Sequence, residues 1–166
     1  MKTVTLITGG FDPIHSGHIE YINHAKKTSD YLVVGINSNE WLINKKGYYF
    51  LPWEERSHII NNLENVDQVI DFNDSDGSAI EAIKKCLEFS DKVIFANGGD
   101  RGKENTPEVS AFTDNKRVQF LYSVGGSDKK NSSSWILDSF IKDFMSQKFS
   151  INTDDLILIN APWGNH

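Results

Sequence analysis

Short apolar runs alternate with amphipathic stretches along most of this sequence, and no other feature restricts its fold as strongly. Runs rich in β-branched residues, which are typical of buried strands, occupy residues 3–8, 31–37, 66–72, 91–97 and 117–124. Stretches with helical apolar spacing lie between them, at residues 16–30, 51–66 and 77–89. Strands that alternate with helices in this way form parallel sheets with right-handed crossovers. We therefore expect an α/β fold: a doubly wound, five-stranded parallel sheet with helices on both faces.

The remaining segments give weaker signals. Ser78 is typical of a helix N-cap, and residues 131–148 begin with serines and predict an amphipathic last helix. The segment 97–116 has the weakest pattern and predicts a long loop, which in a compact domain is often functional. We expect one domain over residues 1–150, with residues 151–166 forming a C-terminal extension or an added edge strand.

Charge and cysteine content narrow the class of partner. The 166 residues carry a formal charge of −6, which argues against a long nucleic acid as ligand because such binding depends on clustered Lys and Arg. The single cysteine, Cys86, cannot form a disulfide framework or a paired-cysteine metal site. The sequence has neither a signal-peptide pattern nor an apolar run of membrane-spanning length. We therefore expect a soluble, cytoplasmic protein with no nucleic-acid or membrane partner.

The stretch GGFDPIHSGH, residues 9–18, follows the first predicted strand and opens the first predicted helix. In a doubly wound sheet this turn is the favoured phosphate site, because the helix N-terminus and the backbone N–H groups attract anions. The expected contacts are the backbone of Gly9, Gly10 and Phe11, the side chains of His15 and His18, and the space left by Gly17. One histidine at a helix start is more often a capping or surface residue. The glycines and the two histidines together are a far more specific sign of a phosphate site.

The same stretch resembles the signature G-x-F-D-x-x-H-x-G-H of the cytidylyltransferase-like nucleotidyltransferases, and it matches at every fixed position. The resemblance continues over residues 23–41, over the E-x-R helix and following strand at 52–70, and at GGD, residues 98–100. Glycerol-3-phosphate cytidylyltransferase and the heptose-phosphate adenylyltransferases have the most similar patterns. The resemblance implies a Rossmann-like fold and the transfer of a nucleotidyl group from CTP or ATP to a phosphate-bearing acceptor, with release of pyrophosphate.

The resemblance also implies roles for the nucleotide-side residues. His15 and His18 would hold the α- and β-phosphates as hydrogen-bond donors, and Lys45 or Lys46 would swing a mobile loop over the triphosphate. Gly98 and Asp100 would help to shape the nucleotide pocket. The family has S-T-T where this chain has Ser132, Ser133 and Ser134, so these serines would bind a phosphate at a helix N-terminus. Their other interpretation is simple N-capping.

The acceptor side is less similar to the relatives. Asp12 would orient the loop or bind the acceptor or Mg²⁺, and Arg56 would contact a phosphate unless it forms only an exposed ion pair. Relatives have an arginine where this chain has Ser127, so Lys129 or Lys130 would replace it. The inserted sequence RGKENTPE after GGD adds Arg101 and leaves the identity of the acceptor open.

From these features we predict a cytoplasmic nucleotidyltransferase that transfers CMP from CTP to a small phosphorylated sugar or polyol. Mg²⁺ is the expected cofactor because it shields the β- and γ-phosphates. An ATP-dependent adenylyltransferase that acts on a sugar phosphate is the alternative. A non-catalytic nucleotide-binding module is a second alternative, of a different class. Because members of the family are often dimers, the resemblance also implies a homodimer.

Overall fold

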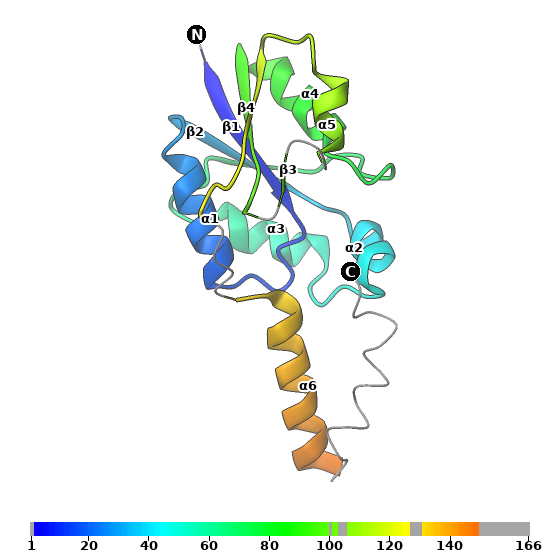
Figure 1. The fold of residues 1–166 in the computed structure, drawn as a ribbon. Coiled ribbons are helices and arrows are strands. Elements are labelled where there is room, and N and C mark those ends of the chain that lie inside the picture. Colours follow the sequence, from blue (N-terminus) through cyan, green and yellow to red (C-terminus); the bar gives the residue numbers. More distant parts are fainter. Residues whose placement is uncertain (1, 100, 103–105, 127–130, 150–166) are drawn as a thin grey trace.

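The computed structural model describes residues 2–99, 101–102, 106–126 and 131–149, and Figure 1 shows the arrangement of their helices and strands. The strands are β1 (Thr3–Gly9), β2 (Tyr31–Ile36), β3 (Gln68–Ile70), β4 (Lys92–Ala96) and β5 (Val118–Leu121). The helices are α1 (Ser16–Lys26), α2 (Asn39–Lys46), α3 (Trp53–Asn61), α4 (Ile80–Phe89), α5 (Pro107–Ala111) and α6 (Ser133–Phe149). The predicted extension at 151–166 lies outside the described residues.

The strands form a single five-stranded sheet of order β3-β2-β1-β4-β5, and every pairing is parallel. The chain runs outward from β1 to β3 and then crosses back to place β4 on the other side of β1. The carboxyl ends of β1 and β4 therefore diverge at the switch point where doubly wound proteins bind ligands. The predicted fold class is confirmed.

Side chains that alternate along the strands build a separate core on each face of the sheet. Val4 and Leu6 of β1 pack with Ala82, Ile83 and Cys86 of α4 on one face. The other face packs against α1 and α3, in a cluster that includes Ile7, Ile22, Ala25, Leu32, Val34 and Ile60. Full burial of one such aliphatic side chain contributes about 1.5–3 kcal/mol. The strands and helices that carry the loops at the sheet edge are therefore firmly held.

Helix α2 occupies the segment that was expected to be a mobile loop. Its N-cap, Ser38, accepts a hydrogen bond from the backbone N–H of Trp41 at 3.0 Å. Gly47 ends the helix in the left-handed region at φ 88°, and its N–H donates to the Ile43 carbonyl at 2.8 Å. Lys45 and Lys46 form the last turn, where positive charge is favourable. The segment is therefore a capped helix and not a loop, and its movement over a triphosphate stays a prediction.

Two further expectations need correction near α4 and α5. Residues 107–111 of the predicted loop fold into α5. Ala79, not Ser78, is the N-cap of α4, and it makes no side-chain capping bond. Its backbone N–H instead donates to Glu108 Oε1 of α5 at 2.7 Å. The Ser78 hydroxyl still accepts the Ile80 N–H at 3.3 Å, so the serine contact that the sequence predicts is present and the long-range contact is added to it.

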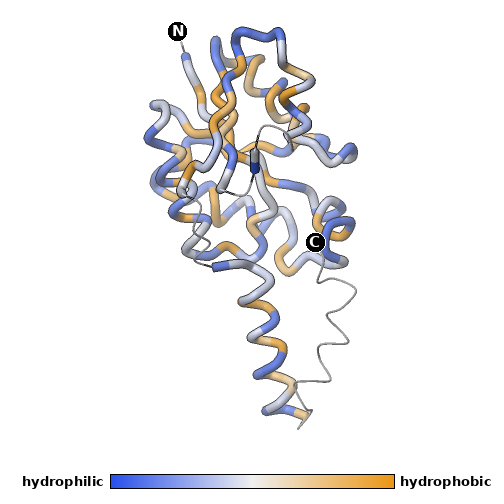
Figure 2. The backbone as a smooth tube through the Cα atoms, viewed as in Figure 1, coloured by the Kyte–Doolittle hydropathy of each residue, from blue (hydrophilic) through white to orange (hydrophobic). Residues whose placement is uncertain are grey.

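Helix α6 extends away from the sheet (Figure 1), and hydrophobic segments alternate with hydrophilic ones along it (Figure 2). Leu137 is its buried side chain, whereas Phe140 is 59% exposed and stacks on Phe144 with 5.7 Å between ring centroids. The expected amphipathic helix is present, but no other described segment covers its aromatic side. Within the described ranges, no helix has both the length and the apolar character required to cross a bilayer.

Candidate active site

A cavity of about 900 Å³ lies at the carboxyl ends of the strands. Its walls come from the β1–α1 loop, α2, the start of α4, the segment after β4, the loop after β5 and the start of α6. Residues from both faces of the sheet line it, from His15 and His18 at α1 to Ser78 and Glu108 at α4 and α5. The volume is within the range of small-molecule sites.

His15 and His18 form a hydrogen-bonded pair at the start of α1. His15 is the N-cap, and its Nδ1 accepts the Gly17 N–H at 3.0 Å. His18 Nδ1 accepts the His15 N–H at 3.2 Å, which completes a reciprocal capping box. The rings stack with 3.8 Å between centroids. Because each Nδ1 is an acceptor, each neutral ring carries its proton on Nε2 and can donate from that atom.

His18 remains neutral in the folded protein. Burial of the ring, together with the nearby His15 and Lys46, lowers the pKa of His18 from its ordinary 6.5 to about 3. The proton on Nε2 is then a hydrogen-bond donor across the whole neutral pH range. A neutral donor suits a phosphate contact that must form and break during turnover.

The glycines of the first loop are needed for close packing. A Cβ at Gly10 would lie 2.7 Å from Leu42 Cδ2, and one at Gly17 would lie 2.9 Å from His15 Cε1. A Cβ at Gly9 would lie 3.2 Å from the Phe11 ring, which is itself buried in the core. Phe11 has a φ of 51°, so the backbone turns sharply at this position. All four residues line the cavity.

Asp12 fixes the segment that follows α2. Its carboxylate is 2% exposed and accepts the backbone N–H of Phe50 at 2.6 Å and that of Leu51 at 2.7 Å. Lys46 Nζ donates to the Asp12 carbonyl at 2.8 Å, and burial lowers the pKa of Lys46. Lys45 Nζ lies over the Trp41 ring, 4.6 Å from its centroid. Of the three roles expected for Asp12, these bonds support loop orientation. Both lysines line the cavity.

Arg56 lies beneath the cavity and does not line it. Its side chain is 1% exposed, and its guanidinium donates to the carbonyls of Gly10, Asn37 and Leu51 and to Asn39 Oδ1, at 2.7–2.9 Å. Every nitrogen of the guanidinium thus has a protein acceptor. The alternative of an exposed ion pair is wrong, and the geometry favours a supporting role over the expected phosphate contact.

The three serines stand at the start of α6, where the sequence places them, and all line the cavity. Ser132 Oγ accepts the Trp135 N–H at 3.2 Å and lies 2.9 Å from Ser134 Oγ. Ser133 Oγ donates to the Pro13 carbonyl at 2.8 Å. Capping accounts for Ser132, and Ser133 ties α6 to the first loop. The helix N-terminus is thereby held beside the histidines.

Other predicted site residues have less defined surroundings. Gly98 lines the cavity, with open space where a Cβ would stand. Asp100, Lys129 and Lys130 lie outside the described residues. Their expected roles stay predictions.

Sequence reasoning missed a buried network under the loop. Asp74 accepts hydrogen bonds from Asn37 Nδ2 and from the backbone N–H and hydroxyl of Ser38, at 2.7–3.0 Å. The Asn37 N–H in turn donates to the Gly9 carbonyl at 2.9 Å. The fixed Asp12 and Asn37 groups hold the loop between β1 and α1 from two sides. A lone aspartate in a predicted turn carries no local signal of this role.

The described residues contain no group of three or more acidic, histidine or cysteine side chains that could hold a metal ion. Both oxygens of Asp12 already accept backbone N–H groups. These residues do not form a protein cage for Mg²⁺. They fit an ion that is held mainly by substrate phosphates and water.

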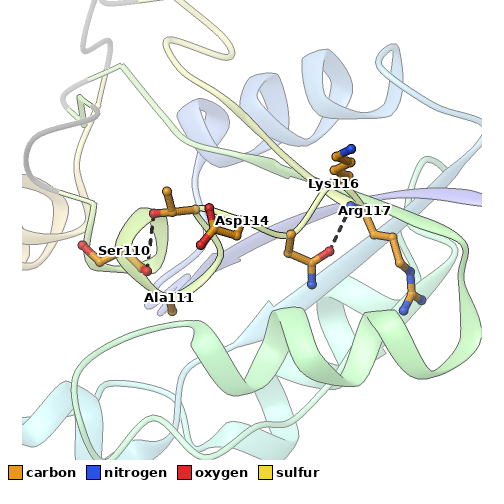
Figure 3. Close-up of a pocket in the computed structure, with 7 residues that line it drawn as sticks. Ser110, Ala111, Asp114, Lys116 and Arg117 are labelled. Carbon is orange, nitrogen blue, oxygen red and sulfur yellow. Dashed lines mark hydrogen bonds between the residues drawn. The ribbon is translucent and has the colours of Figure 1, made fainter.

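A second concave surface of about 550 Å³, formed by residues of the segment 110–117, lies between α5 and β5 (Figure 3). Its polar groups are bonded within the protein. Asn115 Oδ1 accepts the Arg117 N–H, and the Arg117 guanidinium donates to the carbonyls of Leu87, Ser90 and Asp91. It is separate from the histidines in sequence and shares no lining residue with the main cavity. The chemistry is therefore assigned to the main cavity.

Comparison with known proteins agrees with this geometry. The bifunctional protein HldE of Syntrophotalea carbinolica is 31% identical over 149 residues, which are 84% of this chain and 28% of that protein. HldE of Hahella chejuensis is 35% identical over 105 residues, or 62% of this chain and 21% of that protein. This chain thus spans between a fifth and a third of the length of these relatives.

Solved structures give the same fold. The lipopolysaccharide core biosynthesis protein of Thermoplasma volcanium superposes with a TM-score of 0.58 at 26% identity, covering 72% of this chain and 94% of that one. A bifunctional NMN adenylyltransferase/ADP-ribose pyrophosphatase of Francisella tularensis superposes at 0.59 with 13% identity, covering 95% of this chain and 52% of that one. Residues 6–134 match the family model described as Cytidylyltransferase-like, so this chain belongs to the cytidylyltransferase-like family of nucleotidyltransferases.

Proposed function

We propose that this chain transfers a nucleotidyl group to the phosphate of a small sugar phosphate, with ATP as the donor and pyrophosphate as the leaving group. The sequence alone favours CTP. Similarity to HldE, which extends over 84% of the chain, supports the adenylyltransferase alternative instead. The GGD sequence at 98–100, a pattern of the heptose-phosphate adenylyltransferases, points the same way.

The observation that carries the proposal is the pair of histidines at the cavity wall, whose Nδ1 atoms both accept backbone N–H groups. An oxygen of the acceptor phosphate attacks the α-phosphorus in line. A new P–O bond forms there, and the bond to the bridging oxygen breaks and leaves its electron pair on pyrophosphate. The acceptor phosphate is already ionised near neutral pH, so the reaction needs no protein base. Catalysis then depends on positioning and charge stabilisation, which the Nε2–H donors of His15 and His18 supply.

Other groups add positive potential around the triphosphate. Lys46 and Lys45 contribute cations from the end of α2, and the N-terminus of α6 adds backbone N–H groups. Mg²⁺ bound to the nucleotide would neutralise charge on the β- and γ-phosphates. Asp12 and Arg56 keep the loop in place. The homodimer implied by the resemblance stays a prediction, and sedimentation equilibrium would test it.

Pyrophosphate release tests the proposal directly. ATP, CTP, UTP and GTP would each be combined with mannose 1-phosphate, glucose 1-phosphate and glycerol 3-phosphate. We expect release with ATP and a sugar 1-phosphate. Release with CTP and glycerol 3-phosphate would restore the cytidylyltransferase prediction. Nucleotide binding without release from any pair would favour the non-catalytic module.

A further inference from the structure

Glu108 is a buried carboxylate, and one of its two oxygens accepts no hydrogen bond from a described residue. Its side chain is 1% exposed, and Oε1 accepts the Ala79 N–H at 2.7 Å. Oε2 is buried and accepts no hydrogen bond from any described residue. The nearest cation recorded for it is Arg101, whose Nη2 lies 3.5 Å away. Glu108 and Arg101 both line the main cavity.

A buried acceptor without a donor is costly, and more so when it is charged. Such a group on a cavity wall is satisfied when a ligand brings a donor to it. A carboxylate repels phosphate, so the donor belongs to an uncharged part of the ligand. A hydroxyl meets the geometry well, because it can donate to Glu108 and accept from the neighbouring Arg101.

The two ends of the cavity differ in the ligand that they suit. Tyr21, Val124 and Trp135 line the cavity together with the histidines, and they offer aromatic and apolar surface. Two cavity-lining residues contact Glu108, Ala79 and Arg101, and Gly77 and Ser78 directly precede Ala79, so this surface is small or polar. A nucleobase is normally recognised by stacking and apolar contact, whereas a polyol needs small residues and hydrogen bonds.

We propose that Glu108, supported by Arg101, is the specificity determinant for the acceptor and binds hydroxyl groups of a polyhydroxylated phosphate ester. This inference rests on the proposed nucleotidyl transfer and deepens it by placing the acceptor's carbon chain at the α4–α5 end. The phosphate of the acceptor then points toward the histidines, where transfer occurs. Glu108 contacts the substrate but takes no part in bond making.

Direct binding tests the proposal without relying on turnover. Calorimetry would measure the dissociation constants of mannose 1-phosphate, glycerol 3-phosphate and methyl phosphate, each with and without a non-hydrolysable ATP analogue. Glu108→Gln keeps a carbonyl oxygen for the Ala79 N–H but removes the charge. It should weaken mannose 1-phosphate binding about ten- to hundredfold while methyl phosphate and the ATP analogue change less than about twofold. Glu81→Gln, on the exposed side of α4, is the matched control and should change none of them.

Arg101→Gln is a second variant, because Arg101 is 36% exposed and Gln keeps an N–H donor near Glu108. It should also weaken the binding of mannose 1-phosphate more than that of methyl phosphate. Thermal unfolding would verify that both variants fold. Equal weakening of methyl phosphate, or unchanged binding in both variants, would overturn the inference. If the ATP analogue binds the wild type but neither mannose 1-phosphate nor glycerol 3-phosphate does, the inference is wrong and nucleotide use stands. If the ATP analogue itself does not bind, the proposed function fails.

Discussion

The two ends of the cavity are built in opposite ways. At the α1 end, the Nδ1 atoms of both histidines already accept backbone N–H groups, and Asp12 is satisfied as well. At the α4–α5 end, a buried oxygen of Glu108 accepts no hydrogen bond from the part of the chain that the structure describes. The polar groups at the first end are bonded before any ligand arrives, whereas the second end keeps an acceptor that we propose a ligand satisfies. Reaction chemistry and acceptor choice can therefore be altered separately.

The largest expected effect is at His18. His18→Ala removes one donor to the transferring phosphates, and loss of such a donor typically lowers kcat on the order of 10²- to 10³-fold. Nucleotide binding, measured by calorimetry, should change only modestly because the loop and both helix N-termini remain. Pyrophosphate release on the same preparation gives the turnover.

A control is needed because His18 also accepts the His15 N–H. His18→Gln keeps an acceptor that suits the third helical position of a capping box, so it should unfold at nearly the wild-type temperature. Wild-type turnover in a stable His18 variant would remove the histidine end from the mechanism.

The next largest effect is expected at Arg56, under the same end. Arg56→Met leaves the carbonyls of Gly10, Asn37 and Leu51 without their donor, and should lower the free energy of unfolding by about 3 kcal/mol. Urea denaturation measures this loss. Arg56→Lys should recover only part of it, because one ammonium cannot reach all four acceptors. A variant of normal stability with a raised acceptor KM would instead restore the phosphate contact that the sequence suggests.

The low pKa of His18 makes stability depend on pH. As pH falls below 6.5, the unfolded chain binds a proton at His18, whereas the folded protein does so only near pH 3. The stabilisation present above pH 6.5 is therefore lost progressively between pH 6.5 and pH 3. Between pH 7.5 and pH 5, wild type should lose about 2 kcal/mol more than His18→Gln. Equal losses in urea titrations at the two pH values would contradict a neutral, buried His18.

The smallest effect is expected at the lysines of α2. Lys46→Met should lower kcat/KM for the nucleotide about tenfold, since it removes a cation from the triphosphate side. Because Lys46 also bonds the Asp12 carbonyl, the unfolding temperature should fall slightly. Lys45→Met, which loses the contact with the Trp41 ring and no recorded bond to the first loop, should have the weaker effect. If Lys45→Met lowers kcat/KM more than Lys46→Met does, Lys45 is the more important of the two lysines and this prediction is wrong.

The sequence predicts the fold and the first loop well because both depend on local patterns. Burial in a parallel sheet requires nearly continuous apolar runs such as YLVVGI, and a phosphate turn requires glycines before a helix. Arg56 shows where local reasoning fails. It follows Glu54 and Glu55 on one helix, yet they are exposed and it is buried, because α3 turns only Arg56 toward the carbonyls of Gly10 and Asn37. Glu108 was missed for the same reason, since its partner Ala79 is 29 residues away.

Among the described residues, helix α6 contacts the rest of the protein mainly through its first five residues. Ser133 bonds to the Pro13 carbonyl and Leu137 is buried, but the helix beyond them carries Phe140, Phe144 and Phe149 with at least 41% of each exposed. A helix without tertiary packing opens at little energetic cost. Amide hydrogen exchange in α6 should therefore be graded, slow beside the cavity and fast toward Phe149. We expect the far half of α6 to melt as a separate unit while the cavity at the carboxyl ends of the strands keeps its native structure.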